Sequence, residues 1–258
     1  MVASMQCISP DWDVAEKIVA CVTSREGGAS EPPYHSLNFA KHVGDEERNV
    51  DQNRKLLAAR LDPNLRWQWL QQNHGVETVT ITEAAEPITA DGLLTREPGL
   101  VCCVLTADCL PVFFAAKDGS EVALVHAGWR GLAAGILENT VAKFASSTKD
   151  LAIWLGPAIG PCHFEVGSEV KAAFSSQAQS PAEKSALQSC FKATSNPQKT
   201  MADLYAIARI KLARLGLSNV YGGDRCTYCE AEEFYSFRRE GITGRMLSMI
   251  YIDTANSE

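Results

Sequence analysis

Two histidines and one cysteine stand where apolar, strand-like stretches of this sequence give way to polar or glycine-rich turns. His74 lies in residues 71–75, Cys109 in residues 105–111 and His126 in residues 125–131. Functional side chains commonly occupy such strand ends, because a rigid sheet can present them to a cleft. Two imidazoles and one thiolate suit a zinc ion that keeps its fourth position open for water or substrate. The pattern therefore predicts an enzyme with an open zinc site made by His74, Cys109 and His126.

A catalytic role is predicted for two of these ligands and for one neighbour. Asp108 directly precedes Cys109 and is the candidate for proton transfer, with Glu165 as a second choice. A zinc with three protein ligands lowers the pKa of its bound water toward neutrality, which makes hydroxide available. The predicted catalytic residues are therefore Cys109, His126 and Asp108.

Arginines offer a second set of candidate ligand contacts, because a planar guanidinium group pairs with phosphate or carboxylate. Arg25 lies in the glycine-rich loop 24–34, and Arg245 follows Gly244 at the start of the last predicted strand. We expect both to contact the ligand. Arg130 follows His126 in a Gly-Trp-Arg-Gly turn and brings a fixed positive charge to the same region.

Two further thiol-containing segments are weaker candidates for metal binding. Cys162 adjoins His163, but side chains of adjacent residues rarely point the same way. Cys226 and Cys229 form a Cys-x-x-Cys pair, whereas a zinc ribbon needs a second such pair and the sequence has none. We therefore expect Cys226 and Cys229 to be structural or incidental. His42 lies in a polar segment and is expected at the surface.

The elements that would position these residues alternate between strands and helices. Strands are predicted at residues 17–22, 67–70, 76–81, 100–105, 112–116, 122–125, 151–155, 234–237 and 245–252, and helices at residues 45–61, 132–144 and 201–215. Residues 112–125 read as a hairpin. Residues 174–197, rich in Ser, Gln and Ala, are expected to be mobile or peripheral. The pattern predicts a single mixed α/β domain over residues 1–258.

Composition limits the classes of partner. The chain has 258 residues, 24 basic and 31 acidic side chains and a net charge of −7. That balance argues against nucleic acid or an anionic membrane as the main partner. No apolar run approaches a membrane span, and the N-terminal residues do not resemble a signal peptide. The sequence thus predicts a cytoplasmic protein, by default a monomer, that acts on a small molecule.

Taken together, these segments resemble the bacterial laccase-domain family, known as polyphenol oxidase, as purine nucleoside phosphorylase and adenosine deaminase, and as peptidoglycan editing factor. The matching segments are residues 24–28, 36–38, 71–75, 106–111, 126–132, 156–167, 224–228 and 234–246. They follow the family's order over nearly the whole chain. His74, Cys109 and His126 match the family's metal-binding His, Cys and His.

The resemblance implies both a fold and an activity. The implied fold is a layered α/β/α-type domain shared with the cytotoxic necrotizing factor-like cysteine hydrolases. The implied activity is zinc-dependent phosphorolysis of adenosine, inosine and methylthioadenosine-type nucleosides, together with deamination of adenosine to inosine. Arg25 and Arg245 would hold the phosphate, and Asn38 would hydrogen-bond the sugar or base.

Three alternatives remain open from the sequence. Cys109 and His126 alone satisfy the minimum for a metal-free amide hydrolase, which includes the editing of muramyl peptides. A copper-dependent polyphenol oxidase is weaker, because five histidines and no His-x-His pair cannot build a trinuclear copper cluster. One copper replacing zinc would still permit phenol oxidation. A non-catalytic metal-binding protein would need a closed site, and the available Cys102 and Cys103 lie in a strongly apolar run.

Overall fold

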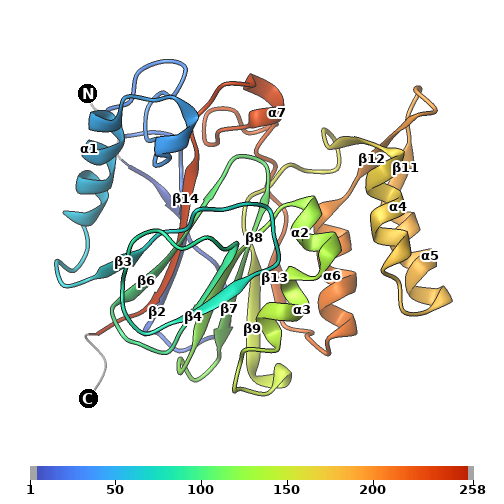
Figure 1. The fold of residues 1–258 in the computed structure, drawn as a ribbon, viewed down its shortest axis with the longest axis horizontal. Coiled ribbons are helices and arrows are strands. Elements are labelled where there is room, and N and C mark those ends of the chain that lie inside the picture. The colour runs from blue at the N-terminus through green and yellow to red at the C-terminus, as the bar shows by residue number, and fades with distance from the viewer. Residues whose placement is uncertain (1–4, 255–258) are drawn as a thin grey trace.

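The computed structural model describes residues 5–254 of the chain, in which helices enclose two large β-sheets (Figure 1). The first sheet has the order β1 (Cys7–Ile8), β2 (Ile18–Thr23), β14 (Met246–Ile252), β6 (Leu100–Thr106) and β3 (Arg66–Gln68). Only the pair of β3 and β6 is parallel among these described strands. The second has the order β13 (Val220–Gly222), β9 (Leu151–Leu155), β7 (Leu110–Ala116), β8 (Val122–Ala127), β5 (Gly92–Thr95) and β4 (Thr78–Ile81).

The two sheets pack face to face, as the alternation of side chains along β6 shows. Leu100, Cys102 and Val104 share one buried core with residues of the second sheet such as Phe113 and Leu124. The intervening side chains of β6 point to the opposite core, under helix α1 (Glu47–Ala58). A strand covered on both faces must be apolar throughout, which explains the unbroken apolar run in the sequence.

The outer face of the second sheet is covered by α2 (Trp129–Ala134), α3 (Ile136–Val141) and α6 (Leu204–Arg214), which share a core with β7 and β9. Figure 1 shows α1 on one side of the sheets and these helices on the other. The mixed α/β class predicted from the sequence is confirmed, and its β-layer consists of two sheets, which gives the order α/β/β/α.

A small third sheet lies at the edge of the molecule beyond α6 (Figure 1). It has the order β10 (Glu165–Gly167), β12 (Lys199–Ala202) and β11 (Phe191–Ala193), and it is joined by α4 (Ser168–Ser176) and α5 (Pro181–Ser189). The predicted peripheral position of residues 174–197 agrees with this arrangement. Phe174, Leu187 and Phe191 attach this region to the main core, in which they are buried.

Two predicted elements were wrong. The helix expected at residues 132–144 is interrupted at Gly135, whose φ of 110° breaks it into α2 and α3. Residues 234–237 do not form a strand; Phe234 and Tyr235 are buried in a loop that leads into α7 (Phe237–Glu240). The side chain of Ser236 caps α7 by accepting a hydrogen bond from the Arg239 amide. Two short 3-10 helices, Lys41–Val43 and Thr148–Asp150, complete the described elements.

The strands predicted at residues 17–22, 100–105, 112–116, 122–125, 151–155 and 245–252 and the helix at residues 45–61 are confirmed to within a few residues. Within residues 5–254, no helix combines the length and the apolar composition needed to cross a membrane.

Candidate active site

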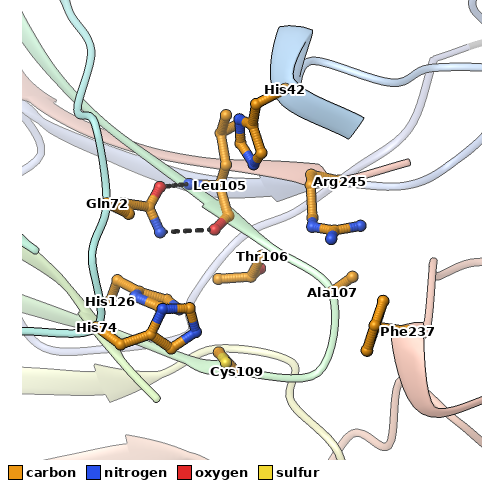
Figure 2. A pocket seen from close by; sticks show the side chains of 10 residues that line it. All are labelled: His42, Gln72, His74, Leu105, Thr106, Ala107, Cys109, His126, Phe237 and Arg245. Carbon is orange, nitrogen blue, oxygen red and sulfur yellow. Dashed lines mark hydrogen bonds between the residues drawn. The ribbon is translucent and has the colours of Figure 1, made fainter. Parts of the chain in front are cut away.

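Cys109 and His126 meet because β7 and β8 form a hairpin whose register places the start of one beside the end of the other. Leu110 at the start of β7 pairs with Ala127 at the end of β8, so Cys109 lies opposite the residue that follows β8. His74 comes from the loop between β3 and β4 (Figure 2). One ligand atom from each of His74, Cys109 and His126 lies within 4.8 Å of the other two. The structure thus brings together the three residues that the sequence singled out.

A buried carboxylate, that of Asp91, positions two of these three residues. Asp91 precedes β5 and is fully buried. Its Oδ1 lies 2.7 Å from Nδ1 of His126 and accepts a hydrogen bond from the His74 amide at 3.0 Å. Its Oδ2 accepts hydrogen bonds from the amides of Asn73 and Gly75 at 3.1 and 2.6 Å. Because Nδ1 of His126 is held by Asp91, Nε2 is the nitrogen free to face Cys109 or a metal.

Two glycines allow the segments of the site to approach one another closely. A Cβ atom on Gly128 would lie 3.1 Å from both Sγ of Cys109 and Cδ2 of His74. A Cβ atom on Gly131 would lie 2.6 Å from the carbonyl oxygen of Gly75. The glycine-rich turn therefore serves the packing of α2 against the loop that carries His74.

The environment favours the charged forms of Cys109 and His126. Burial alone would raise the pKa of the Cys109 thiol, but the charge of His126 and hydrogen bonds from both histidines lower it to about 6. Burial opposes protonation of His126, but Cys109 and Asp91 raise its pKa to about 9. A thiolate stabilised at neutral pH is both the nucleophilic form and the metal-binding form of cysteine.

The donor set fits a single transition-metal ion. His74 is exposed, Cys109 is half-buried and His126 is buried, and all three line the same cavity. The two imidazole rings are nearly perpendicular, with centroids 4.7 Å apart. A soft thiolate with two imidazoles suits zinc or a single copper, and it leaves one coordination position for a ligand from the cleft.

Two cavities adjoin these residues. The first, of about 260 Å³, is lined by His42, Gln72, His74, Leu105, Thr106, Ala107, Cys109, His126, Phe237 and Arg245 (Figure 2). The second, of about 420 Å³, is lined among others by Asp108, Trp129, Arg130, Phe164, Glu165, Lys199 and Arg238. His74, Ala107, Cys109 and Phe237 line both cavities, so they form the boundary between the two.

Arg245 and Arg130 are the predicted binding residues that line these cavities. In Figure 2 the Arg245 guanidinium faces the first cavity across from His74. Its Nη1 donates to the carbonyl oxygens of Thr243 and Gly244, each at 2.9 Å. Burial lowers the pKa of Arg245, and no carboxylate of residues 5–254 forms an ion pair with it. Arg130 is exposed and lies over the ring of Trp129 at the second cavity.

Arg25 and Asn38, the other two predicted binding residues, bind other parts of the chain in this structure. Arg25 forms an ion pair with Glu240 at 2.6 Å and lies 4.7 Å above the ring of Tyr235. Asn38 is fully buried, and its Oδ1 accepts a hydrogen bond from the Arg245 amide at 2.9 Å. Neither residue lines the two cavities. Asn38 therefore helps to hold the backbone of Arg245 in place.

Asp108 lies at the second cavity, but its carboxylate holds neighbouring segments. Oδ1 accepts a hydrogen bond from the Thr227 hydroxyl at 2.6 Å, and Oδ2 accepts one from the Arg238 amide at 2.7 Å. Its φ of 88° lies in the left-handed region, where non-glycine residues are uncommon. This geometry supports a positioning role for Asp108 and does not support the predicted proton transfer.

Four residues of the site were missed by sequence reasoning: Asp91, Gln72, His42 and Phe237. The Gln72 amide pairs with the backbone of Leu105, donating at 2.9 Å and accepting at 2.8 Å. His42 is exposed, as predicted, yet it lines the first cavity. Asp91 gave one signal in the sequence, an acidic residue that stands with Gly92 just before the apolar pair Leu93 and Leu94.

Known proteins are similar to this chain in sequence and in fold. A family described as multi-copper polyphenol oxidoreductase laccase matches residues 19–253. Purine nucleoside phosphorylase YfiH of Shigella flexneri is 46% identical over 248 residues, covering 95% of this chain and 98% of the relative. A purine nucleoside phosphorylase of Pseudomonas aeruginosa is 44% identical over 245 residues, with the same coverage. A crystal structure of a Neisseria meningitidis protein has a TM-score of 0.88 at 40% identity, covering 96% of this chain and 99% of that one.

These matches extend over nearly the whole chain and include every segment of the site. They confirm the resemblance drawn from residues 71–75, 106–111 and 126–132. The chain belongs to the family described as multi-copper polyphenol oxidoreductase laccase.

Proposed function

We propose that this protein is a zinc-dependent purine nucleoside enzyme that cleaves purine nucleosides with phosphate and deaminates adenosine to inosine. The names of its relatives support phosphorolysis. The observation that carries the proposal is the placement of Arg245, a guanidinium without an ion-pair partner in the described chain, beside the His74–Cys109–His126 cluster. A partly buried cation without a carboxylate is suited to an anionic ligand.

Arg245 is the proposed phosphate-binding residue. Its Nη1 is held by two backbone carbonyls, and its backbone amide is held by Asn38, so the guanidinium is fixed before a ligand arrives. In phosphorolysis, a phosphate oxygen forms a bond to C1′ of the ribose while the bond from C1′ to the purine nitrogen breaks. A fixed guanidinium lowers the cost of bringing the charged phosphate into the cleft.

The two cavities offer room for the nucleoside beside the phosphate. Phe237 lines both cavities and is 56% exposed, which is unusual for a large apolar side chain. An exposed aromatic ring that lines a ligand-sized cavity is suited to stacking on a purine. We therefore place the base against Phe237 and the ribose toward Cys109.

His74, Cys109 and His126 are the proposed zinc ligands. A bound zinc with three protein ligands acts as a Lewis acid and lowers the pKa of a coordinated water toward neutrality. Deamination replaces the amino group at C6 of adenosine by the oxygen of water, and ammonia leaves. His42 is the proposed group for proton exchange, because partial desolvation beside the cavity and the charge of Arg245 lower its pKa, which favours the neutral imidazole.

The test is an assay of adenosine and of inosine plus phosphate, with the wild type and His74→Ala compared. Formation of free purine and ribose 1-phosphate, lost in His74→Ala together with the zinc bound at the His74–Cys109–His126 site, is the expected result. A wild type that turns over neither nucleoside contradicts the proposal.

A second candidate function is metal-free amide hydrolysis, including the editing of muramyl peptides. The observation that favours it is the chain of Cys109, His126 and Asp91, which has the order of a nucleophile, a base and an orienting carboxylate. Chelation distinguishes the two candidates, because activity that persists after removal of the metal supports the thiol mechanism alone.

Copper-dependent phenol oxidation is the weakest of the three. Within residues 5–254, neither metal-capable cluster holds more than two histidines, whereas a trinuclear copper cluster needs many more. The donor set at Cys109 fits one copper, so we expect phenol oxidation only as a side reaction of copper-loaded protein.

A further inference from the structure

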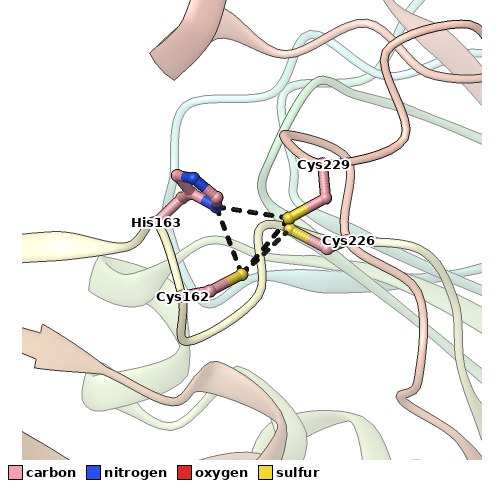
Figure 3. Close-up of side chains that lie close together, drawn as sticks. All are labelled: Cys162, His163, Cys226 and Cys229. Atoms are coloured by element: carbon pink, nitrogen blue, oxygen red, sulfur yellow. Dashed lines mark hydrogen bonds between the residues drawn. The ribbon is translucent and has the colours of Figure 1, made fainter.

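A second cluster of metal-capable side chains lies apart from the candidate active site. It consists of Cys162, His163, Cys226 and Cys229, whose ligand atoms all lie within 4.8 Å of one another (Figure 3). The expectation that Cys162 and His163 point apart was wrong, because Nδ1 of His163 lies 3.2 Å from Sγ of Cys162. The Cys-x-x-Cys pair finds its partners in another loop and not in a second pair of the same form.

Parallel pairing between β9 and β13 brings the two loops together. Leu155 at the end of β9 pairs with Gly222 at the end of β13, so the segments that follow both strands leave the sheet side by side. Farther along, the Thr227 amide donates a hydrogen bond to the carbonyl oxygen of Ala158 at 3.0 Å. The cluster therefore joins two segments that the fold already holds in register.

The separations within the cluster lie at or a few tenths of an ångström below those of a tetrahedral zinc site, so that small side-chain movements would accommodate the ion. With Zn–S of about 2.3 Å and Zn–N of about 2.0 Å, a tetrahedron places two sulfurs about 3.8 Å apart and a sulfur and a nitrogen about 3.5 Å apart. Sγ of Cys162 lies 3.8 Å from Sγ of Cys226 and 3.3 Å from Sγ of Cys229. Nδ1 of His163 lies 3.3 Å from Sγ of Cys229.

The surroundings hold these side chains in place. The Gly160 amide donates a hydrogen bond to Sγ of Cys226 at 3.2 Å, which suits a metal-bound thiolate. The ring of His163 stacks on that of Tyr228, with centroids 3.9 Å apart and an interplanar angle of 13°. The Cys226 amide is bound by Glu230 at 2.7 Å. Among these supporting contacts, only the one from the Gly160 amide reaches a ligand atom of the cluster, Sγ of Cys226.

We propose that Cys162, His163, Cys226 and Cys229 bind a structural zinc ion through a closed set of three thiolates and one imidazole. Four protein ligands leave no open position, which is the mark of a structural site as distinct from a catalytic one. A disulfide would use two sulfurs at about 2.05 Å and leave His163 and the third thiol without a role.

The proposed ion stabilises the turn that carries Cys109. The loop after β9 donates a hydrogen bond from the Ile159 amide to the carbonyl oxygen of Asp108 at 2.9 Å. The loop after β13 donates one from the Thr227 hydroxyl to the Asp108 carboxylate. Crosslinking the two loops therefore fixes Asp108 from both sides, and with it the position of the neighbouring Cys109.

The first experiment measures zinc per chain in protein purified with a thiol reductant. Cys229→Ser is compared with the wild type and with Cys7→Ser, which removes an exposed cysteine outside both clusters. We expect Cys229→Ser to hold about one zinc fewer than the wild type, and Cys7→Ser to match the wild type. Equal zinc in Cys229→Ser and the wild type overturns the proposal. The comparison does not depend on whether the site at Cys109 holds metal.

The second experiment keeps the proposal testable if Cys229→Ser does not fold. His74→Ala, altered at an exposed residue of the first site, is loaded with zinc, and its zinc X-ray absorption is measured. Three sulfurs at about 2.3 Å and one nitrogen at about 2.0 Å are expected. Zinc surrounded mainly by nitrogen and oxygen, no bound zinc, or a Cys162–Cys229 disulfide in the reduced protein overturns it.

Discussion

The carboxylate of Asp91 lies 2.7 Å from Nδ1 of His126, with both side chains almost completely removed from solvent. The same carboxylate accepts hydrogen bonds from the backbone amides of residues 73–75. It therefore fixes both the loop that carries His74 and the imidazole of His126. A single buried acid therefore sets the distance between two of the proposed zinc ligands.

Asp91→Asn should weaken zinc binding at this site by about 10–100-fold, because the supporting partner of a metal-binding histidine tunes its orientation and basicity. Titration of the metal-free protein with zinc against a competing chelator measures the change. Asp118→Asn, at an exposed turn, is the matched control. Unchanged affinity in Asp91→Asn would show that the loop and His126 are held by other contacts.

Arg245→Gln should raise the KM for phosphate about tenfold or more, since a hydrogen bond to a charged group contributes about 1.5–3 kcal/mol. The KM for the nucleoside should change little. Steady-state kinetics with phosphate as the varied substrate measures the effect, with the exposed Arg48→Gln as control. An equal rise in both KM values would argue that Arg245 does not bind phosphate.

Asp108→Asn should lower kcat only modestly and leave the shape of its pH profile unchanged, because the carboxylate holds Thr227 and Arg238. Asp108→Ala should be less stable than Asp108→Asn, since alanine tolerates a φ of 88° poorly, at a cost of about 1–3 kcal/mol. Loss of one limb of the pH profile of kcat in Asp108→Asn would instead identify Asp108 as a proton-transfer group.

In metal-free protein, alkylation of Cys109 should show a midpoint near pH 6 instead of the ordinary value of 9, because the histidines lower the pKa of its thiol. The thiolate persists above that midpoint, and labelling slows as the pH falls through it. Peptide mass spectrometry after timed iodoacetamide treatment reports on Cys109 alone. His126→Ala should move the midpoint upward, and bound zinc should protect the thiol.

Glu121→Gln should lower the free energy of unfolding by about 1–3 kcal/mol at neutral pH. Burial would raise the pKa of Glu121, but amide hydrogen bonds from Ser146 and Ala145 and the charge of Arg96 lower it below 4.5. A depressed pKa stabilises the fold above the ordinary value, and this contribution is lost as the pH falls through the folded-state pKa. Urea titrations at pH 7 and below 4 should therefore show the difference shrinking, with the exposed Glu83→Gln unaffected.

Local sequence patterns predicted the strands of the core and the three residues of the candidate metal site. Apolar runs such as residues 100–105 identify strands covered on both faces, and polar turns after such runs mark where His126 and Cys109 emerge. These signals are local, so they could be read without knowing the fold.

What could not be predicted depends on contacts between distant segments. Asp91 reaches His126 only because β5 pairs with β8. The Arg25 guanidinium forms its ion pair with Glu240, which lies 215 residues away in the sequence. Cys162 meets Cys226 only because β9 and β13 are parallel neighbours. No spacing within one segment contains that information.

The chain crosses from one sheet to the other at residues 107–109, and the candidate site extends across this crossing. Arg245 precedes β14 of the five-stranded sheet, while Cys109 and His126 belong to the hairpin of the six-stranded sheet. The separation between the proposed anion site and the proposed zinc site is thus set by how the two sheets stack through side chains such as Phe113 and Met246. Substitutions deep in that layer, far from any ligand, should therefore lower activity, because they would shift Arg245 relative to Cys109 and His126.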